Sequence, residues 1–142
     1  MKNFKIISTF FLLSLFFFTS LYGKNNYFKE GEKLFSKKKI KESKFKFEKD
    51  IVFNPKNEKS YLYLAKIFKI QKNDEFQERN LNTVILLDPK NEEAIYLLAL
   101  LKIKQSDYKK AKELISVFKK VCNNICKNEI ELSETLKNLQ PN

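Results

Sequence analysis

A 34-residue period constrains the fold of this chain more than any other feature of its sequence. The stretch NPKNEKSYLYLA at residues 54–65 returns as DPKNEEAIYLLA at residues 88–99, with six of the twelve positions identical. A third, weaker copy begins near Lys24, and small residues coincide in all three copies, at Gly31, Ala65 and Ala99. Because a biased composition alone would not keep small residues in register three times, the period indicates a repeating structure.

Each copy predicts two helices joined by a short polar turn. Residues 58–71 carry four apolar residues on one face at helical spacing, namely Tyr61, Leu64, Ala65 and Phe68. Residues 74–87 repeat this spacing, and Asp74 is expected to cap that second helix. Pro55 and Pro89 end one helix pair before the next begins. Since no segment alternates apolar and polar residues, the sequence predicts an all-α chain.

The pattern resembles the tetratricopeptide repeat, in which an aromatic residue, a Leu-Gly or Leu-Ala pair and a second aromatic are followed by Ala, Phe and Pro. The second and third copies carry most of it, at Tyr61, Leu64, Ala65, Phe68, Leu81 and Pro89, then at Ile95, Leu98, Ala99, Tyr108, Ala111 and Ile115. The resemblance implies a helix-turn-helix solenoid of three repeats, at residues 24–57, 58–91 and 92–125. Residues 126–142 would then be a capping helix and tail, with an apolar face of Ile130, Leu132, Leu136 and Leu139.

The resemblance also implies where a partner binds, because the first helices of such repeats line a concave face that holds an extended peptide or a helix. Carried onto this chain by register, the groove residues are Asn25, Phe28, Glu32 and Phe35, then Lys59, Leu62, Lys66, Lys69 and Ile70, then Glu93, Tyr96, Leu100, Ile103 and Lys104. Apolar residues flanked by Lys66, Lys69 and Lys104 would suit a protein partner with apolar anchors and acidic side chains. The alternative is that some of the aromatic residues cover neighbouring helices or form a dimer contact. The family's clamp for the C-terminal carboxylate of chaperones is not reproduced, because Phe28 and Glu32 stand where Lys and Asn would be expected.

The first 23 residues have the pattern of a signal peptide. Two lysines precede an apolar run at residues 6–18, and Gly23 offers the small side chain that a cleavage site needs. Leu21 is larger than is usual at its place, so an uncleaved membrane anchor at residues 6–22 is the alternative, at the short limit for a bilayer span. Either interpretation predicts an exported bacterial protein of the periplasm or cell envelope, and the second predicts membrane association.

The side chains offer little for catalysis. The sequence contains no His, which removes the commonest general base, the usual partner of Ser and Cys nucleophiles, and the usual zinc ligand. We therefore expect no enzyme activity, no metal and no cofactor. Cys122 and Cys126 are the only thiols. A disulfide that clamps the third repeat to the capping helix and two free thiols are both open, because the spacing does not decide the geometry.

The formal net charge of +11 leaves further hypotheses open. Removing residues 1–23 would take away two lysines and no acid, so a charge of +9 would remain to attract nucleic acid, anionic lipid or an acidic protein. Arg79 is the only arginine, so a lysine coat on solvated helices explains the charge better than phosphate recognition, and no nucleic-acid partner is expected. The leading hypothesis is a non-enzymatic adaptor that binds a protein partner. A lysine-rich binder of polyanions or membrane surfaces and a self-associating structural unit are the alternatives.

Overall fold

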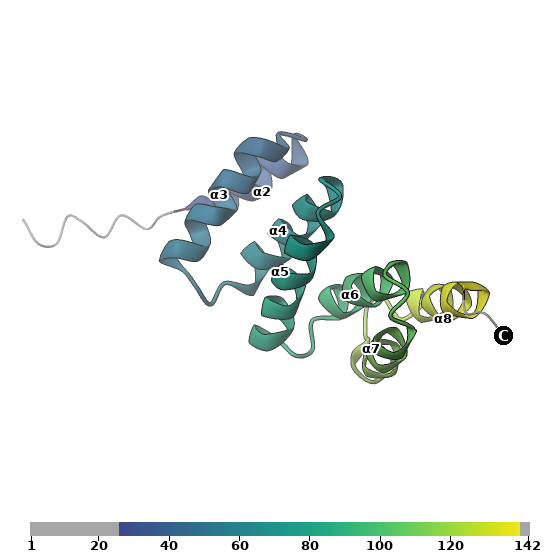
Figure 1. Cartoon of the computed structure of the whole chain (residues 1–142). Coiled ribbons are helices and arrows are strands. Elements are labelled where there is room, and N and C mark those ends of the chain that lie inside the picture. The colour runs from purple at the N-terminus through teal and green to yellow at the C-terminus, as the bar shows by residue number, and fades with distance from the viewer. Residues whose placement is uncertain (1–25, 140–142) are drawn as a thin grey trace, which may run out of the picture.

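The computed structural model describes residues 26–139, which form helices connected by short turns and loops (Figure 1). Three antiparallel pairs follow one another: α2 (Tyr27–Ser36) with α3 (Ile40–Phe53), α4 (Glu58–Ile70) with α5 (Asp74–Leu87), and α6 (Glu92–Lys104) with α7 (Tyr108–Val121). A last helix, α8 (Asn128–Leu139), packs against α6 and α7. No strand occurs in this range, so the predicted all-α, helix-turn-helix solenoid is confirmed.

The helix pairs follow the period of the sequence. The repeats predicted at residues 24–57, 58–91 and 92–125 each contain one helix pair, and residues 126–142 contain α8. The predicted signal peptide or anchor at residues 1–23 lies outside the described residues, as does Asn25. Among the helices from α2 to α8, none is long and apolar enough to cross a membrane.

The two helices of the first repeat meet where a glycine lies against a large ring. A Cβ atom added to Gly31 of α2 would stand 2.7 Å from Cε1 of Phe47 in α3. The Ser43 hydroxyl of α3 also donates a buried 2.9 Å hydrogen bond to the carbonyl oxygen of Gly31. The other repeats combine alanine with a smaller apolar residue at the corresponding positions, Ala65 with Leu81 and Ala99 with Ile115. The size of the small residue therefore varies inversely with that of its large partner.

The turns inside the three repeats share one backbone conformation. A residue with positive φ occurs in each turn at intervals of 34 residues: Lys38 at 58°, Lys72 at 55° and Ser106 at 60°. Because such angles are uncommon outside glycine, their recurrence shows that the period extends to the backbone. The helix cap after the second turn differs from the prediction. Asn73, not Asp74, accepts the capping hydrogen bond from the N–H of Phe76, because Asp74 is already the first helical residue.

The interior consists of two groups of buried side chains. The larger group is mainly aliphatic and extends from α4 through α5, α6 and α7 to α8. The smaller group lies between the first two repeats and is rich in aromatic rings, including Phe28, Phe35, Phe47, Tyr63 and Phe68. Leu132 and Leu136 of α8 join the larger group, whereas Ile130 and Leu139 are exposed. The apolar face predicted for the capping helix was thus too wide, because α8 packs only on the side that faces α6 and α7.

A buried carboxylate lies where the first repeat meets the second. Asp50 of α3 is 1% exposed and accepts hydrogen bonds from three side chains that follow it in the sequence. The donors are the Ser60 hydroxyl, the Asn57 amide at 2.6 Å and the Asn54 amide at 3.0 Å. These bonds offset the free energy that an unpaired carboxylate would cost in the interior. The corresponding residue of the second repeat is Val84, so the period in the backbone does not require the same chemistry at each junction.

Candidate functional site

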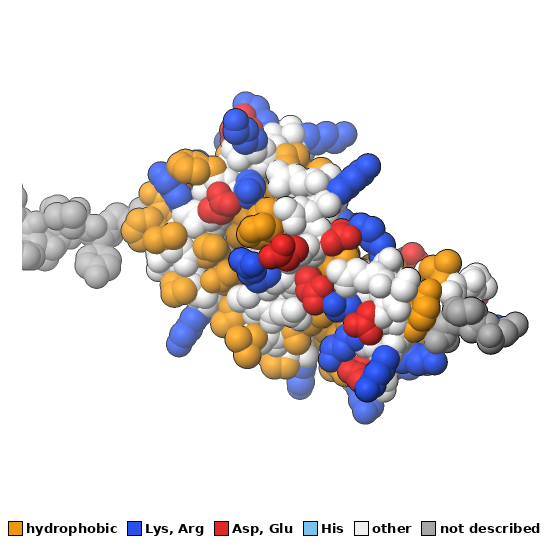
Figure 2. Space-filling view, in the orientation of Figure 1, with side chains coloured by type: hydrophobic (Ala, Val, Ile, Leu, Met, Phe, Trp, Pro, Cys, Tyr) orange, Lys and Arg blue, Asp and Glu red, His pale blue; other side chains and the backbone are white. Residues whose placement is uncertain are grey.

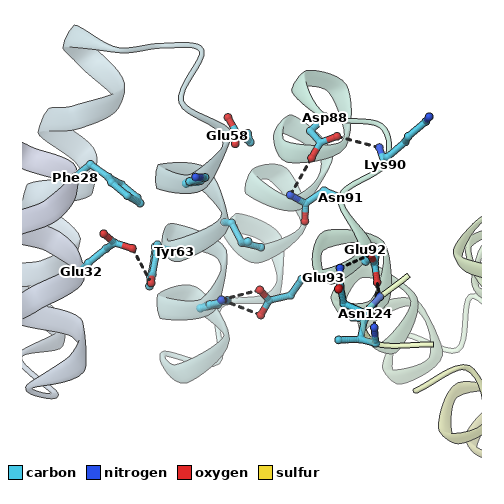
Figure 3. Close-up of a pocket in the computed structure, with 14 residues that line it drawn as sticks. Phe28, Glu32, Glu58, Tyr63, Asp88, Lys90, Asn91, Glu92, Glu93 and Asn124 are labelled. Carbon is cyan, nitrogen blue, oxygen red and sulfur yellow. Dashed lines mark hydrogen bonds and ion pairs between the residues drawn. The ribbon is translucent and has the colours of Figure 1, made fainter. Parts of the chain in front are cut away.

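The first helices of the three repeats, α2, α4 and α6, line one groove (Figure 3). Its volume is about 600 Å³. The loop before α6 and the loop after α7 complete its walls. The residues that define the groove are Phe28, Glu32, Glu58, Lys59, Leu62, Tyr63, Lys66, Asp88, Lys90, Asn91, Glu92, Glu93, Asn124 and Ile125.

The residues predicted to bind a partner are divided between two hollows. Six of them line the groove, namely Phe28, Glu32, Lys59, Leu62, Lys66 and Glu93. Three more line a separate cavity of about 270 Å³ beside Gln77, namely Lys69, Leu100 and Lys104. Phe35, Ile70, Tyr96 and Ile103 line neither of these two hollows. The predicted residues are therefore distributed over these two hollows and over positions that line neither of them.

Several of the predicted apolar residues pack inside the chain. Phe28 and Phe35 both contact Tyr63 of α4, with ring centroids 5.9 and 5.2 Å from it, and Tyr63 stacks on Phe47 at 4.7 Å. These half-buried rings stabilise the contact between the first two repeats. Ile103 is only 3% exposed and belongs to the aliphatic core, which corrects the prediction that it faces a partner. A helix face can be chosen from spacing, but its burial depends on the neighbouring repeat.

Tyr96 is turned toward the capping helix. Its ring centroid lies 6.1 Å from that of Phe118 in α7, and its hydroxyl donates a 3.1 Å hydrogen bond to Oε2 of Glu131 in α8. Burial, and then the hydrogen bond and charge of Glu131, raise the pKa of the Tyr96 phenol. Tyr96 thus connects α6 to α8 within the chain.

The charge of the groove contrasts with that of the whole chain. Five carboxylates and three lysines line the groove, although the chain carries a formal charge of +11. Lys66 of α4 pairs with Glu93 of α6 at 2.8 Å, and outside the groove Lys104 pairs with Asp74 at 2.7 Å. Two of the three lysines expected to attract an acidic partner are therefore already paired within the chain. The groove itself is acidic.

Tyr63 belongs to the groove, although it was not among the groove residues predicted from the sequence. Its hydroxyl donates a 3.2 Å hydrogen bond to Oε1 of Glu32 and so joins α4 to α2. Burial, and then the charge of Glu32, raise the pKa of the Tyr63 phenol, which keeps it a neutral donor. Tyr63 is next to Leu62 in sequence and was not on the helix face that the family resemblance indicated. It reaches the groove because α2 packs on α4 at this point.

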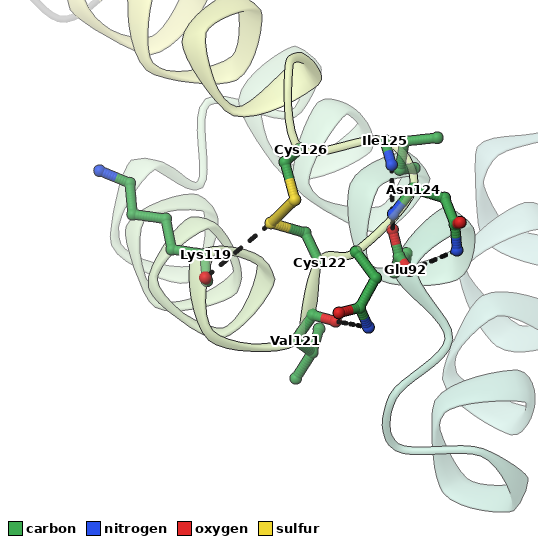
Figure 4. The surroundings of a disulfide bond; sticks show 8 residues. Glu92, Lys119, Val121, Cys122, Asn124, Ile125 and Cys126 are labelled. Carbon is green, nitrogen blue, oxygen red and sulfur yellow. Dashed lines mark hydrogen bonds between the residues drawn. A yellow bond between two sulfur atoms is a disulfide. The ribbon is translucent and has the colours of Figure 1, made fainter.

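Glu92 in the first turn of α6 holds the loop that follows α7 (Figure 4). Its carboxylate accepts hydrogen bonds from the N–H groups of Asn124 and Ile125 at 3.0 and 3.1 Å, and from the Asn124 amide at 3.1 Å. Backbone N–H groups, that of Asn123 first and then that of Asn124, hold the pKa of Glu92 below its ordinary value. Because these residues are more than thirty positions apart in sequence, no local signal could have revealed the contact.

A disulfide joins Cys122 to Cys126 in the same loop (Figure 4). The two Cα atoms are 5.2 Å apart, within the usual range for such a bond. Cys122 directly follows α7, and Cys126 lies just before α8, so the bond closes the connection between the two helices. Asn124 and Ile125 lie inside this closed loop and form part of the groove wall. Among residues 26–139, no group of three or more acidic or thiol side chains is arranged to hold a metal ion.

No protein-family model matches this sequence, and no curated protein matches it. Solved structures do match its fold. The TPR2B domain of yeast Sti1 in complex with pHsp70 has a TM-score of 0.71 at 16% identity, covering 80% of this chain and 95% of that one. The first TPR domain of Spaghetti (RPAP3), bound to an HSP90 peptide, has a TM-score of 0.71 at 18% identity, covering 80% and 90%. The Yersinia enterocolitica chaperone SycD, in complex with a peptide of the translocator YopD, has a TM-score of 0.69 at 10% identity, covering 80% and 88%.

These similarities agree with the architecture described above. The compared domains are nearly matched in length by this chain, and the superposition extends over four-fifths of its residues. At such low identity the likeness concerns the fold and not the ligand. The chain therefore folds as a tetratricopeptide-repeat solenoid.

Proposed function

We propose that this chain is a non-enzymatic adaptor of the bacterial cell envelope, which binds a segment of a partner protein in the groove between α2, α4 and α6. The observation that carries the proposal is the groove itself, a hollow of about 600 Å³ lined by three successive first helices. The Sti1 and SycD structures support it, because those proteins of the same fold are seen with pHsp70 and with a YopD peptide.

The chemistry of the groove favours a partner with apolar and cationic side chains. Leu62 and the half-buried ring of Phe28 offer apolar contact. Among the residues that the structure describes, Glu58 has no lysine or arginine within ion-pair distance, so its carboxylate is available to a cation. Because like charges are rejected at short range, an acidic segment is disfavoured beside Glu58 and Glu32. This replaces the acidic partner expected from the lysines alone.

A photo-crosslinking residue in place of Lys59 tests the proposal in the native cell envelope. Lys59 is exposed on the rim of the groove, so a bound segment should give one discrete adduct. Lys109, an exposed lysine of α7, gives the matched control position, and no such adduct is expected there.

A charge reversal then distinguishes binding in the groove from nonspecific binding. We expect Glu58→Lys to remove the adduct formed from position 59, because it places a cation where the partner's cation should bind. Glu113→Lys on α7 is the matched control and should leave the adduct unchanged. An adduct that persists in the Glu58 variant, or that forms equally well from position 109, would exclude the groove as the binding site.

A further inference from the structure

Four apolar side chains are exposed where the second helices of the first two repeats end. Val52 and Phe53 end α3, and Leu86 and Leu87 end α5, so the two pairs are related by the 34-residue period. Val52 and Leu86 are the most exposed of the four, at 74% and 80%. We call these four residues the end-of-repeat edge. Figure 2 shows hydrophobic side chains along this side of the molecule, from α3 toward the end of α5.

Packing within the chain does not account for the end-of-repeat edge. The buried residues of α3 and α5 lie elsewhere on these helices, at Phe47 and at Leu81 among others. The third repeat has Lys120 and Val121 at the corresponding positions, and Lys120 is exposed. The edge is thus confined to the two repeats nearest the N-terminus. Exposed apolar residues gathered on one side of a small domain indicate an interaction surface.

The N-terminal segment of the chain leaves the described structure at this edge. The ring of Tyr27, the first residue of α2, lies 5.6 Å from that of Phe53. Only residues 23–26 separate Tyr27 from the apolar stretch at residues 6–22. Even a fully extended connector of this length spans at most roughly 18 Å. The connector therefore limits how far residue 22 can lie from Tyr27, whose ring is beside Phe53 at one end of the end-of-repeat edge.

Three lysines lie near the end-of-repeat edge. The Lys49 ammonium group lies 5.5 Å from the centroid of the Tyr27 ring. Lys56 and Lys90 are exposed in the loops that follow α3 and α5, each directly after a proline. Ammonium groups beside exposed apolar side chains suit the interface of an anionic bilayer. There the apolar side chains reach the boundary of the acyl region, and the lysine ammonium groups remain among the headgroups.

Two of the acids near this edge, Glu48 and Asp88, are engaged in contacts within the chain. Glu48 pairs with Lys44 at 3.4 Å on α3. Asp88, in the loop after α5, accepts hydrogen bonds from the N–H of Lys90 and from the Asn91 amide. In the described part of the chain, neither Glu48 nor Asp88 forms an ion pair with Lys49 or Lys56.

We propose that residues 6–22 are retained as a membrane-inserted segment and that the end-of-repeat edge rests on the surface of an anionic lipid bilayer. Residues 23–26 then act as a short tether, and Lys49, Lys56 and Lys90 lie in the headgroup region. The first helices begin at this side of the molecule, so α2 and α4 extend away from the bilayer.

The absence of tryptophan from the sequence makes a direct test possible. Single-tryptophan variants of the full chain, Phe53→Trp and Leu86→Trp, are placed in vesicles that contain phosphatidylglycerol, with and without brominated acyl chains. Val117→Trp, at an exposed apolar position of α7 in the third repeat, is the matched control. We expect blue-shifted emission and loss of most of the intensity to brominated lipid at positions 53 and 86, and neither effect at position 117.

Charge and salt distinguish a lipid surface from other occupants. Replacing Lys49, Lys56 and Lys90 together by glutamate should restore most of the emission at position 53, as should uncharged phosphatidylcholine vesicles or high salt. Emission at positions 53 and 86 that stays typical of water in both vesicle types would overturn the proposal. It would also be overturned by a blue shift that depends on protein concentration without lipid, which indicates a second copy, or by a cellular protein whose mass lacks residues 1–23.

Discussion

The contact between repeats one and two differs from the contact between repeats two and three, although the backbone period is the same. At the first junction Asp50 meets Ser60 through a buried hydrogen bond, whereas the corresponding residues of the second junction are Val84 and Ala94, both fully buried. The first junction also holds a separate aromatic core, while the second is continuous with the aliphatic core that reaches α8. The period thus fixes the helix geometry and leaves the chemistry of each junction free to vary.

This difference predicts unequal coupling along the chain. In a repeat protein each unit is stabilised by its own packing and by the interface with its neighbours. Because the first repeat contributes to the smaller core, we expect it to open separately from the others.

The largest effects should come from removing one ring from each core. Phe47→Ala and Phe118→Ala each delete a fully buried ring and should cost about 3–5 kcal/mol of unfolding free energy. The loss at Phe47 should increase amide hydrogen exchange in α2 and α3 alone, whereas the loss at Phe118 should increase it from α4 to α8. If Phe47→Ala increased amide hydrogen exchange in α6 and α7 to the same degree, the two cores would unfold as one cooperative unit.

The polar junction can be converted into its aliphatic counterpart. Asp50→Ala should cost about 2–3 kcal/mol in urea unfolding, because the buried Ser60 hydroxyl and the Asn57 amide lose their acceptor. The double change Asp50→Val with Ser60→Ala reproduces Val84 and Ala94 and should recover most of that loss. A double variant as unstable as the sum of its single changes would show that the junctions are not interchangeable.

The glycine contact offers a smaller test inside the first repeat. Gly31→Ala should cost about 1–3 kcal/mol, because its Cβ would press on the Phe47 ring. Adding Phe47→Leu recreates the Ala65 and Leu81 pair of the second repeat and should restore part of the stability. Ala99→Gly in the third repeat is the control: it removes a methyl group at the corresponding position. It should lower stability through the greater backbone freedom of glycine and not through a steric conflict.

The smallest effect is expected at Glu92, which is half-buried and holds the loop after α7. Its pKa is lowered on folding, so its stabilisation is complete above the unfolded value of 4.5 and is lost as the pH falls through the lower folded value. Glu92→Gln should therefore lower the thermal midpoint at neutral pH and have little effect in acid. If the difference in thermal midpoint between Glu92→Gln and the parent chain were the same at low pH, the charge of Glu92 would not be what stabilises the contact.

Much of the fold could be predicted because a period is local information. The helix pairs and the small residues Gly31, Ala65 and Ala99 recur at fixed offsets, and each copy supports the others. The cap at Asn73 was missed because an asparagine and an aspartate stand side by side, and either can accept the same hydrogen bond.

The groove was less predictable because its walls come from distant parts of the chain. Glu92 and Asn124 meet across 32 residues, and Tyr63 enters through packing on α2. The burial of Ile103 likewise depends on its neighbours in the aliphatic core. Sequence register selects a helix face, but only the stacking of repeats decides which part of that face is left open.

The close approach of Gly31 to Phe47 restricts the order in which this pair can change during evolution. Enlarging the glycine first produces a collision, whereas shrinking the ring first leaves a void that the chain can survive and that a later methyl group can fill. Either change made alone therefore costs stability, and we expect the two positions to change together. For the same reason, exchanging a helix of one repeat for its counterpart in another should cost stability unless its companion helix is exchanged with it.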